Sequence, residues 1–261
     1  MAAGHQFVMI EISLQLATFL IFAAFVAGFV DAIAGGGALI TLPALLLAGL
    51  PPLDALATNK LQGGFGAATA LVNYTRGGHV RPQDQLAMAA IAAGASVIGT
   101  LVARRVPVEM LQVIMPVFLL ALAMFFALRR GLSDNDRVAR MRPGIFAITL
   151  VPLVGAYDGF FGPGTGTFYM MGFVLLAGHG ILKATAHTKL LNLSSNLGSF
   201  LVFIPTGAVH WGLGLAMAAA QIAGASLGAR VAMRIGAGLI RPLLVVTSTA
   251  MALRLLWQAF S

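Results

Sequence analysis

Long stretches of this chain carry almost no charge. Residues 12–52 contain a single charged side chain, Asp31, and residues 143–182 contain only Asp158. About 20 apolar residues cross a bilayer as a helix, because a helix satisfies its own backbone groups. Only 9% of the 261 residues are charged and 59% are hydrophobic, whereas about 25% of a soluble domain is charged. The sequence therefore predicts an integral membrane protein whose surroundings include the lipid bilayer.

The remaining composition excludes several function classes. The net charge is +8, but the Lys and Arg residues are scattered at the ends of apolar runs, as membrane orientation requires, and not gathered in a nucleic-acid-binding patch. The absence of cysteine excludes thiol catalysis and thiolate metal sites. The histidines have no carboxylate or second histidine at metal-ligand spacing. We expect no metal, no cofactor and no nucleic-acid partner.

Glycines divide the two longest apolar runs. Residues 12–50 and 143–180 are each too long for one span, and Gly35-Gly36-Gly37 and Gly162-Pro163-Gly164 interrupt them. Each run then consists of two helices, of which the second is short. The predicted helices are 12–34, 38–50, 53–75, 84–104 and 107–128, followed by 144–161, 165–179, 182–205, 208–233 and 237–258.

The two sets of helices match each other. Residues 31–37 correspond to 158–164, and residues 57–61 to 186–190, each pair separated by about 130 residues. This duplication divides the chain into a first transmembrane repeat (1–128), a basic cytoplasmic linker (129–142) and a second transmembrane repeat (143–261).

The positive-inside rule favours an inverted arrangement. With the linker in the cytoplasm and every helix crossing, most Lys and Arg lie inside, whereas short helices that dip in and return divide them almost evenly. Each repeat has an odd number of helices, so the second enters from the opposite side. The expected fold is all-α: a polytopic membrane protein with two inverted repeats of about five helices each, ten helices in total, some of them short or broken.

The breaks are candidate anion sites. Helix N-termini attract negative charge, and the short helices begin after Gly36-Gly37 and at Gly164-Thr165, so two positive ends can converge on one site. The alternative is that these glycines only let helices bend and pack closely.

Two lysines occupy matching positions inside predicted helices. Lys60 and Lys189 lie several residues from the helix ends, where a charge is costly and is usually functional or paired. The alternative is that their long stems reach the headgroups. Asp31 and Asp158 precede the breaks and have three open roles: counter-ions of the lysines, proton carriers, or acceptors for the free N–H groups of the break.

One helix face in the second half is polar. Lys189, Asn192, Ser195, Asn196 and Ser199 recur at helical spacing. The first half has Gly63, Gly66 and Ala67 where the second has Asn192, Ser195 and Asn196. This asymmetry suits an off-centre polar substrate; the alternative is hydrogen bonding between helices. In the first half, Asn59, Gln62 and Asn73 are further candidates.

A small-residue motif, Gly224-Ala225-Ser226-Leu227-Gly228, is typical of close helix packing. Such packing occurs either within one chain or between the two chains of a homodimer.

Four segments carry a family resemblance: Asp31 to Pro43 (DAIAGGGALITLP), Ala55 to Leu61 (ALATNKL), Tyr157 to Gly166 (YDGFFGPGTG) and Lys183 to Asn196 (KATAHTKLLNLSSN). They resemble the sulfite exporter TauE/SafE family, also called the 4-toluenesulfonate uptake permease family. The resemblance implies a multi-pass permease of the bacterial inner (plasma) membrane for small sulfur-containing anions such as sulfite or organosulfonates. The residues themselves indicate an anion transporter, and only the resemblance indicates that the anion contains sulfur.

The leading hypothesis is therefore a secondary transporter, not an enzyme, that works by alternating access. Its substrate site is predicted at Gly36, Gly37, Asn59, Lys60, Gly164, Thr165, Lys189, Asn192 and Asn196. One alternative is a passive anion channel. Another is an intramembrane enzyme that uses Asp31 and Asp158 as a carboxylate pair.

Overall fold

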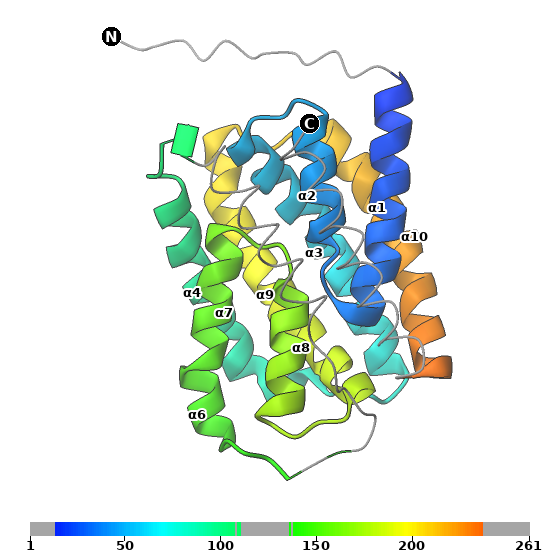
Figure 1. Cartoon of the computed structure of the whole chain (residues 1–261), viewed down its shortest axis with the longest axis vertical. Coiled ribbons are helices and arrows are strands. Elements are labelled where there is room, and N and C mark those ends of the chain that lie inside the picture. The colour runs from blue at the N-terminus through cyan, green and yellow to red at the C-terminus, as the bar shows by residue number, and fades with distance from the viewer. Residues whose placement is uncertain (1–13, 108, 111–135, 137, 237–261) are drawn as a thin grey trace, which may run out of the picture.

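The computed structural model describes residues 14–236 apart from 108, 111–135 and 137, and these residues form helices and loops without any strand (Figure 1). The helices are α1 (Leu14–Ala34), α2 (Ala38–Leu47), α3 (Pro52–Arg76), η1 (Pro82–Gln85), α4 (Leu86–Ala103), α6 (Pro143–Ile148), α7 (Leu150–Phe160), α8 (Thr165–Leu175), α9 (Ile181–Phe203), η2 (Ile204–Thr206) and α10 (Trp211–Ile235). The predicted helices 107–128 and 237–258 and most of the linker 129–142 lie outside the described residues. The other predicted helices are present, with boundaries that differ by a few residues.

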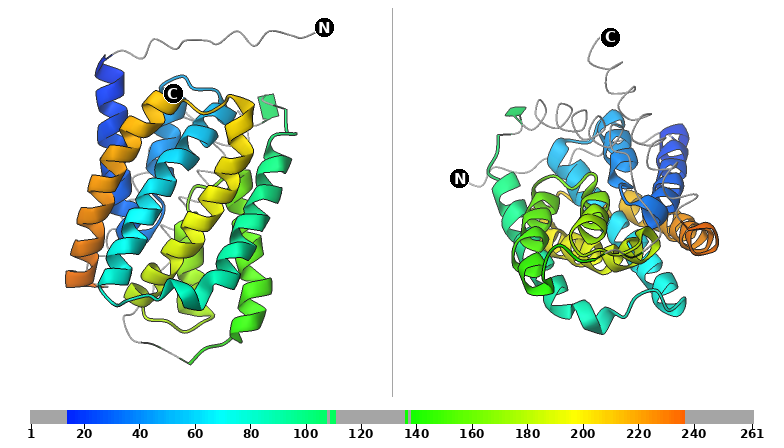
Figure 2. Two further views of the ribbon diagram at one scale, coloured as in Figure 1. Left: turned by 180° about the vertical axis from the view of Figure 1, so that it is seen from behind. Right: turned by 60° about the horizontal axis from the view of Figure 1, so that its bottom comes forward.

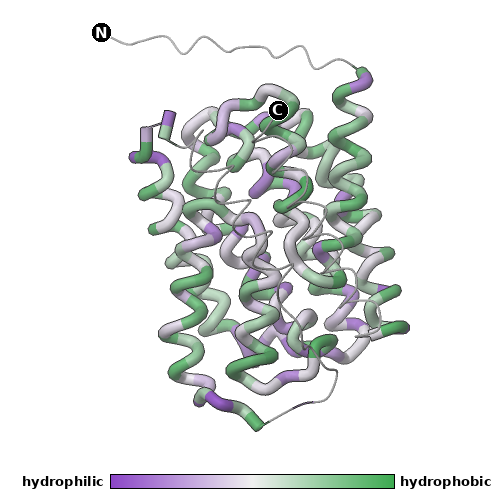
Figure 3. The backbone as a smooth tube through the Cα atoms, viewed as in Figure 1, coloured by the Kyte–Doolittle hydropathy of each residue, from purple (hydrophilic) through white to green (hydrophobic). Residues whose placement is uncertain are grey.

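The described helices have the composition of a membrane protein. Four helical stretches are long and apolar enough to cross a membrane. They are α1 (Leu14–Ala34), η1 with α4 (Pro82–Ala103), α6 with α7 (Pro143–Phe160) and α10 (Trp211–Ile235). Large apolar side chains on them, including Phe22, Ile98 and Leu153, are exposed. Figure 3 shows hydrophobic residues along the outer helices and hydrophilic ones at the ends and centre of the bundle. The predicted all-helical membrane protein is thus confirmed.

Local sequence explains the helix breaks. Gly35 and Gly162 have φ angles of +75° and +95°, a backbone region that glycine enters without a steric penalty. The short interruption between α6 and α7 at Thr149 precedes Pro152. A proline ring clashes with the carbonyl group four residues earlier, here that of Ile148.

The helices pack across the two halves of the sequence. α1 packs on α10, and its counterpart α7 packs on α4, while α3 contacts α10 and α9 contacts α4. α3 and α9 also contact each other, so α10, α3, α9 and α4 form a row of tilted helices (Figure 2). Every helix of this row has neighbours from the other half.

The small-residue motif lies in the α1–α10 contact. A Cβ atom added at Gly224 would lie 2.0 Å from the carbonyl oxygen of Phe25, and one added at Gly228 would lie 2.4 Å from that of Phe29. Of the two alternatives, packing within the chain is therefore the one observed for this motif.

At each glycine break the chain reverses direction. α2 runs back toward the end where α1 begins, and α8 runs back toward the end where α6 begins (Figure 1). In agreement, the backbone N–H groups of Arg140 and Met141, just before α6, donate to the carbonyl oxygen of Leu176, just after α8, at 2.9 and 3.0 Å. The prediction that each short helix crosses the membrane is wrong for α2 and α8. Helices of 10 and 11 residues are only about 15 Å long, half the thickness of the hydrocarbon layer.

The hairpins leave the predicted separation of basic residues intact, because α1 and α2 together, and likewise α6–α7 and α8, return the chain to its starting side just as two full crossings would. The arrangement rejected from the sequence differs, because there the first helix crosses fully and only the short helix dips in and returns. One end of the bundle carries most of the described Lys and Arg residues outside its interior: Arg76, Arg81, Arg140, Arg142, Lys183, Arg230 and Arg234. Arg104 and Arg105 lie at the opposite end, after α4.

Candidate functional site

The tips of the two hairpins meet inside the bundle. A Cβ atom added at Gly35 would lie 2.5 Å from both the carbonyl carbon of Gly166 and the backbone nitrogen of Thr167. The Thr167 hydroxyl donates to the carbonyl oxygen of Ala34 at 3.2 Å. The two breaks, which are far apart in the sequence, are therefore in direct backbone contact.

Each break is held by the aspartate that precedes it. The N–H group of Gly37, just before α2, donates to Asp31 Oδ1 at 3.1 Å. At the start of α8, the Thr165 hydroxyl donates to Asp158 Oδ1 at 2.9 Å. Asp31 thus accepts from a backbone N–H group of the break, one of the three roles left open by the sequence, whereas Asp158 accepts from a hydroxyl group instead.

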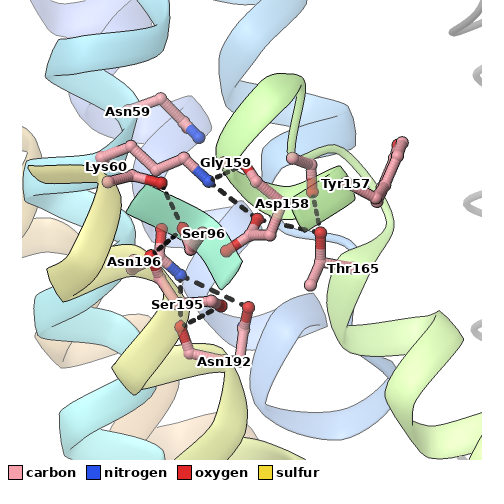
Figure 4. Close-up of polar contacts among 12 residues, drawn as sticks. Asn59, Lys60, Ser96, Tyr157, Asp158, Gly159, Thr165, Asn192, Ser195 and Asn196 are labelled. Carbon is pink, nitrogen blue, oxygen red and sulfur yellow. Dashed lines mark hydrogen bonds and ion pairs between the residues drawn. The ribbon is translucent and has the colours of Figure 1, made fainter. Parts of the chain in front are cut away.

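The same carboxylates are counter-ions of the buried lysines, and each ion pair joins the two halves. Lys60 Nζ lies 2.7 Å from Asp158 Oδ1 and 2.5 Å from the carbonyl oxygen of the same residue (Figure 4). Lys189 Nζ lies 3.2 Å from Asp31 Oδ2 and also donates to the carbonyl oxygen of Asp31. Lys60 and Lys189 are only 2% and 0% exposed. They do not reach toward headgroups, so the snorkelling alternative is wrong for both.

A small cavity lies beside these pairs. Its volume is about 20 Å³, which is room for roughly one water molecule. The predicted residues that line it are Asp31, Gly36, Gly37, Asn59, Asp158, Gly164, Asn192 and Asn196. The structure places Lys60, Lys189 and Thr165 behind this lining, where they hold the two aspartates.

Amide side chains from both halves face the cavity. Asn59 Oδ1 accepts hydrogen bonds from Thr41 Oγ1 at 2.5 Å and from Gln62 Nε2 at 2.8 Å. Asn196 Nδ2 donates to the carbonyl oxygen of Asn192 at 2.7 Å, and a Cβ atom added at Gly63 would lie 3.6 Å from Asn196 Oδ1. The second half thus presents amides where the first half presents glycine.

Not every polar residue of the predicted face takes part. Ser96 on α4 donates to the carbonyl oxygen of Ser195 at 2.6 Å and is hydrogen-bonded to Ser199 at 2.6 Å. For the Ser199 side chain the alternative of hydrogen bonding between helices is therefore the one observed, whereas the Ser195 hydroxyl donates to the carbonyl oxygen of Asn192 within α9 at 3.2 Å.

Sequence reasoning missed Gln221 on α10, which also lines the cavity. It is 2% exposed, and its Oε1 atom has no hydrogen-bond partner among the described residues. The only signal in the sequence is a single amide within an otherwise apolar stretch.

A second polar cluster lies at the basic end. Asp136 accepts from the backbone N–H of Gly180 at 2.6 Å and pairs with Lys183 at 3.0 Å. These contacts, the first being the stronger, lower the pKa of Asp136. His179 stacks on Phe173 with ring centroids 5.4 Å apart, and its partial burial lowers its pKa. No group of three or more His, Asp or Glu residues arranged to hold a metal ion occurs in the part of the chain that the structure describes.

Comparison with known proteins finds relatives over nearly the whole chain. Residues 20–255 match the family model "Sulfite exporter TauE/SafE". No solved structure matches the chain.

Three relatives illustrate the similarity. "Probable membrane transporter protein ORF9" of Sinorhizobium sp is 53% identical over 246 residues, 94% of either chain. "Probable membrane transporter protein YfcA" of Escherichia coli (strain K12) is 42% identical over 92% of this chain and 89% of its own. A "Probable membrane transporter protein" of Haemophilus influenzae is 40% identical over 95% and 97%, respectively. Because the match covers nearly the whole chain, the chain belongs to the sulfite exporter TauE/SafE family of membrane transporters.

Proposed function

We propose that this chain is a secondary transporter that moves a small sulfur-containing anion, such as sulfite or an organosulfonate, through the cavity between the two hairpins. Its two halves form inverted repeats of five helices each, counting the segments outside the described residues. The reciprocal packing supports this arrangement: α1 on α10 mirrors α7 on α4, and α3 on α10 mirrors α9 on α4.

The observation that carries the proposal is the exchange of ion pairs between the halves. The lysine of each half holds the aspartate at the break of the other half, and both aspartates line one cavity. Inverted repeats with interrupted helices at equivalent positions are typical of secondary transporters, whose substrate sites lie near the membrane midplane.

The lining suits an anion. Gly37 and Gly164 immediately precede the N-termini of α2 and α8 and both line the cavity, and helix N-termini favour negative charge. The amide groups of Asn59, Asn192 and Asn196 add hydrogen-bond donors. Thr165, Lys60 and Lys189 complete the site from behind the lining. The sulfur in the substrate rests on the family name.

The small size of the cavity supports alternating access. A space for about one water molecule does not hold a sulfonate, so binding requires the hairpin tips to separate. Rocking of the group formed by α1, α2, α3 and α10 against the group formed by α4, α7, α8 and α9, with the α3–α9 contact between the groups as pivot, would open the cavity to one side at a time. The basic end then faces the cytoplasm of a bacterial cell, with the protein in its inner membrane.

The test is anion flux into liposomes that contain the purified protein, measured with sulfite, thiosulfate, sulfoacetate and, as a non-sulfur anion, chloride. We expect saturable flux of at least one sulfur-containing anion. The Lys189→Ala variant should reduce it at least tenfold, whereas Lys183→Ala, which alters an exposed lysine on the same helix, should leave it unchanged. Flux that does not saturate, with single-channel currents, would indicate a passive channel instead. A folded Lys189→Ala variant with normal flux would remove Lys189 from the site.

A further inference from the structure

The two ion pairs look equivalent but differ at one atom. Asp31 uses both carboxylate oxygens: Oδ1 accepts from the Gly37 N–H group and Oδ2 from Lys189. Asp158 uses only one, since Lys60 and Thr165 both donate to Oδ1. Asp158 Oδ2 is buried and has no hydrogen-bond partner among the described residues. In Figure 4 this second oxygen points away from Thr165.

Other acceptors without a partner lie near the free oxygen. Gln62 Oε1 and Gln221 Oε1 are also buried without a partner in the described part of the chain, and both residues line the cavity together with Asp158. Buried acceptors without donors are unfavourable. A carboxylic acid in place of the carboxylate would add an O–H donor at this position.

Protonation at Oδ2 leaves the existing contacts in place. Oδ1 would still accept from Lys60 and Thr165, so the hairpin tip keeps its hydrogen bonds. Protonation of Asp31 would instead compete with the Gly37 N–H group or with Lys189 for one of its oxygens. The geometry therefore favours Asp158 over Asp31 as the carboxylate that accepts a proton.

The charges around Asp158 determine what protonation does. Lys60 from α3 is its counter-ion, Tyr157 on α7 and Tyr169 on α8 are the nearby titratable groups, and Asp31 lines the same cavity. α4, packed against α7, contributes the hydroxyl of Thr100, which donates to the carbonyl oxygen of Gly159. Lys60 is thus the cation at Asp158, and protonation of Asp158 leaves the positive charge of Lys60 uncompensated.

We propose that Asp158 carries the coupling proton and that transport is anion–proton symport. A proton from one compartment adds to Asp158 Oδ2 and forms the neutral acid, so the Lys60 ammonium group, next to the cavity wall at Gly162, becomes available to an anion. The anion and the proton leave together on the other side, which restores the Lys60–Asp158 pair. A monovalent anion is then carried without net charge movement, whereas a divalent anion such as thiosulfate or sulfoacetate moves one net negative charge per cycle. The inference rests on the proposed transport function.

The wild-type protein provides the first test. Liposomes with the protein and the pH dye pyranine in their lumen receive labelled thiosulfate or sulfoacetate outside, with protein-free liposomes as the control. We expect the lumen to acidify as the anion enters, and an inward proton gradient to concentrate the anion severalfold. Anion flux without acidification would overturn the coupling while leaving the transport function intact. Absence of protein-dependent flux for every anion of the earlier screen would instead overturn the transport function itself.

Two matched variants test the residue. Asp158→Asn mimics the neutral acid, so exchange of labelled for unlabelled anion should continue at a lower rate, while acidification disappears and the accumulation ratio falls to about one. In Asp31→Asn, whatever flux remains should still acidify the lumen. The opposite pattern, with coupling lost in Asp31→Asn and kept in Asp158→Asn, would overturn the assignment.

Infrared difference spectra give a readout that does not depend on the folding of Asp158→Asn. Addition of the anion should produce the carbonyl band of a protonated carboxylic acid in the wild type and in Asp31→Asn. Absence of the band in the wild type would overturn the proposal.

Discussion

Lys60 on α3 and Asp158 on α7 join the two halves of the chain, with Nζ 2.7 Å from Oδ1 and both side chains almost fully buried. Lys189 and Asp31 repeat the pair in reverse. Removing one partner of a buried ion pair leaves an uncompensated charge and costs about 3–5 kcal/mol, whereas replacing both by apolar residues is often close to neutral.

This difference predicts a rescue of stability without a rescue of function. Lys60→Met and Asp158→Leu should each lower the thermal midpoint of the detergent-solubilised protein, and the double variant should recover most of the loss. Transport should be absent in Lys60→Met and in the double variant, because both lack the Lys60 charge that the anion requires. A double variant less stable than both single variants would show that the pair stabilises the fold beyond charge compensation.

The extent of the helices was predictable from the sequence because charges and glycines mark the helix ends. The glycine breaks did not reveal in which direction the chain continues after them. Gly35-Gly36-Gly37 ends α1 whether the next helix continues across the membrane or turns back, and only the short length of α2 argues for the turn. The partners of Lys60 and Lys189 were likewise open, since sequence spacing does not say that each lysine pairs with the aspartate of the other half.

The site was predictable where polarity recurred. Asn192 and Asn196 stand out by their helical spacing, and both line the cavity. Gln221 has no periodic partner, so only the packing of α10 on α3 shows that it faces the same space.

The contact between the hairpin tips leads to a second prediction. In Gly35→Ala, the new Cβ atom would lie 2.5 Å from backbone atoms of Gly166 and Thr167, at a φ of +75°. Overpacking of this kind costs about 1–3 kcal/mol, and the positive φ adds strain. We expect a lower thermal midpoint and loss of anion flux. Gly94→Ala, on α4 with nothing within 4 Å, is the control and should behave like the wild type. Normal flux in Gly35→Ala would show that the tips are not in close contact during transport.

The small-residue motif on α10 gives a third prediction. Gly224→Ala places a Cβ atom 2.0 Å from the carbonyl oxygen of Phe25 and should destabilise the protein by about 1–3 kcal/mol without changing its oligomeric state. Gly212→Ala, on the same helix with open space around it, should change neither the stability nor the oligomeric state. Thermal melting and light scattering of the purified variants measure both quantities. A changed oligomeric state with unchanged stability would place the motif in a contact between chains.

His179 makes the stability of the basic end depend on pH. Burial lowers its pKa below the usual 6.5, so the folded state favours the neutral ring. Its stabilising contribution is complete above about pH 6.5, the pKa of the unfolded chain. The contribution is lost as the pH falls toward and through the lowered pKa of the folded state. The thermal midpoint should therefore fall between pH 7 and pH 5, and by less in His179→Gln. An equal fall in both proteins would assign the effect to other groups.

Gln221 separates a role in binding from a role in stability. Its Oε1 atom is buried without a partner among the described residues, and an apolar group of similar shape in such a position is close to neutral or stabilising. Gln221→Leu should therefore keep or raise the thermal midpoint while lowering anion flux several-fold, because the cavity loses an amide that faces the substrate. Ile222→Leu, at the neighbouring and more exposed position on α10, should change neither. If Gln221→Leu instead lowers stability and flux together, Gln221 supports the packing of α10 and does not contact the anion.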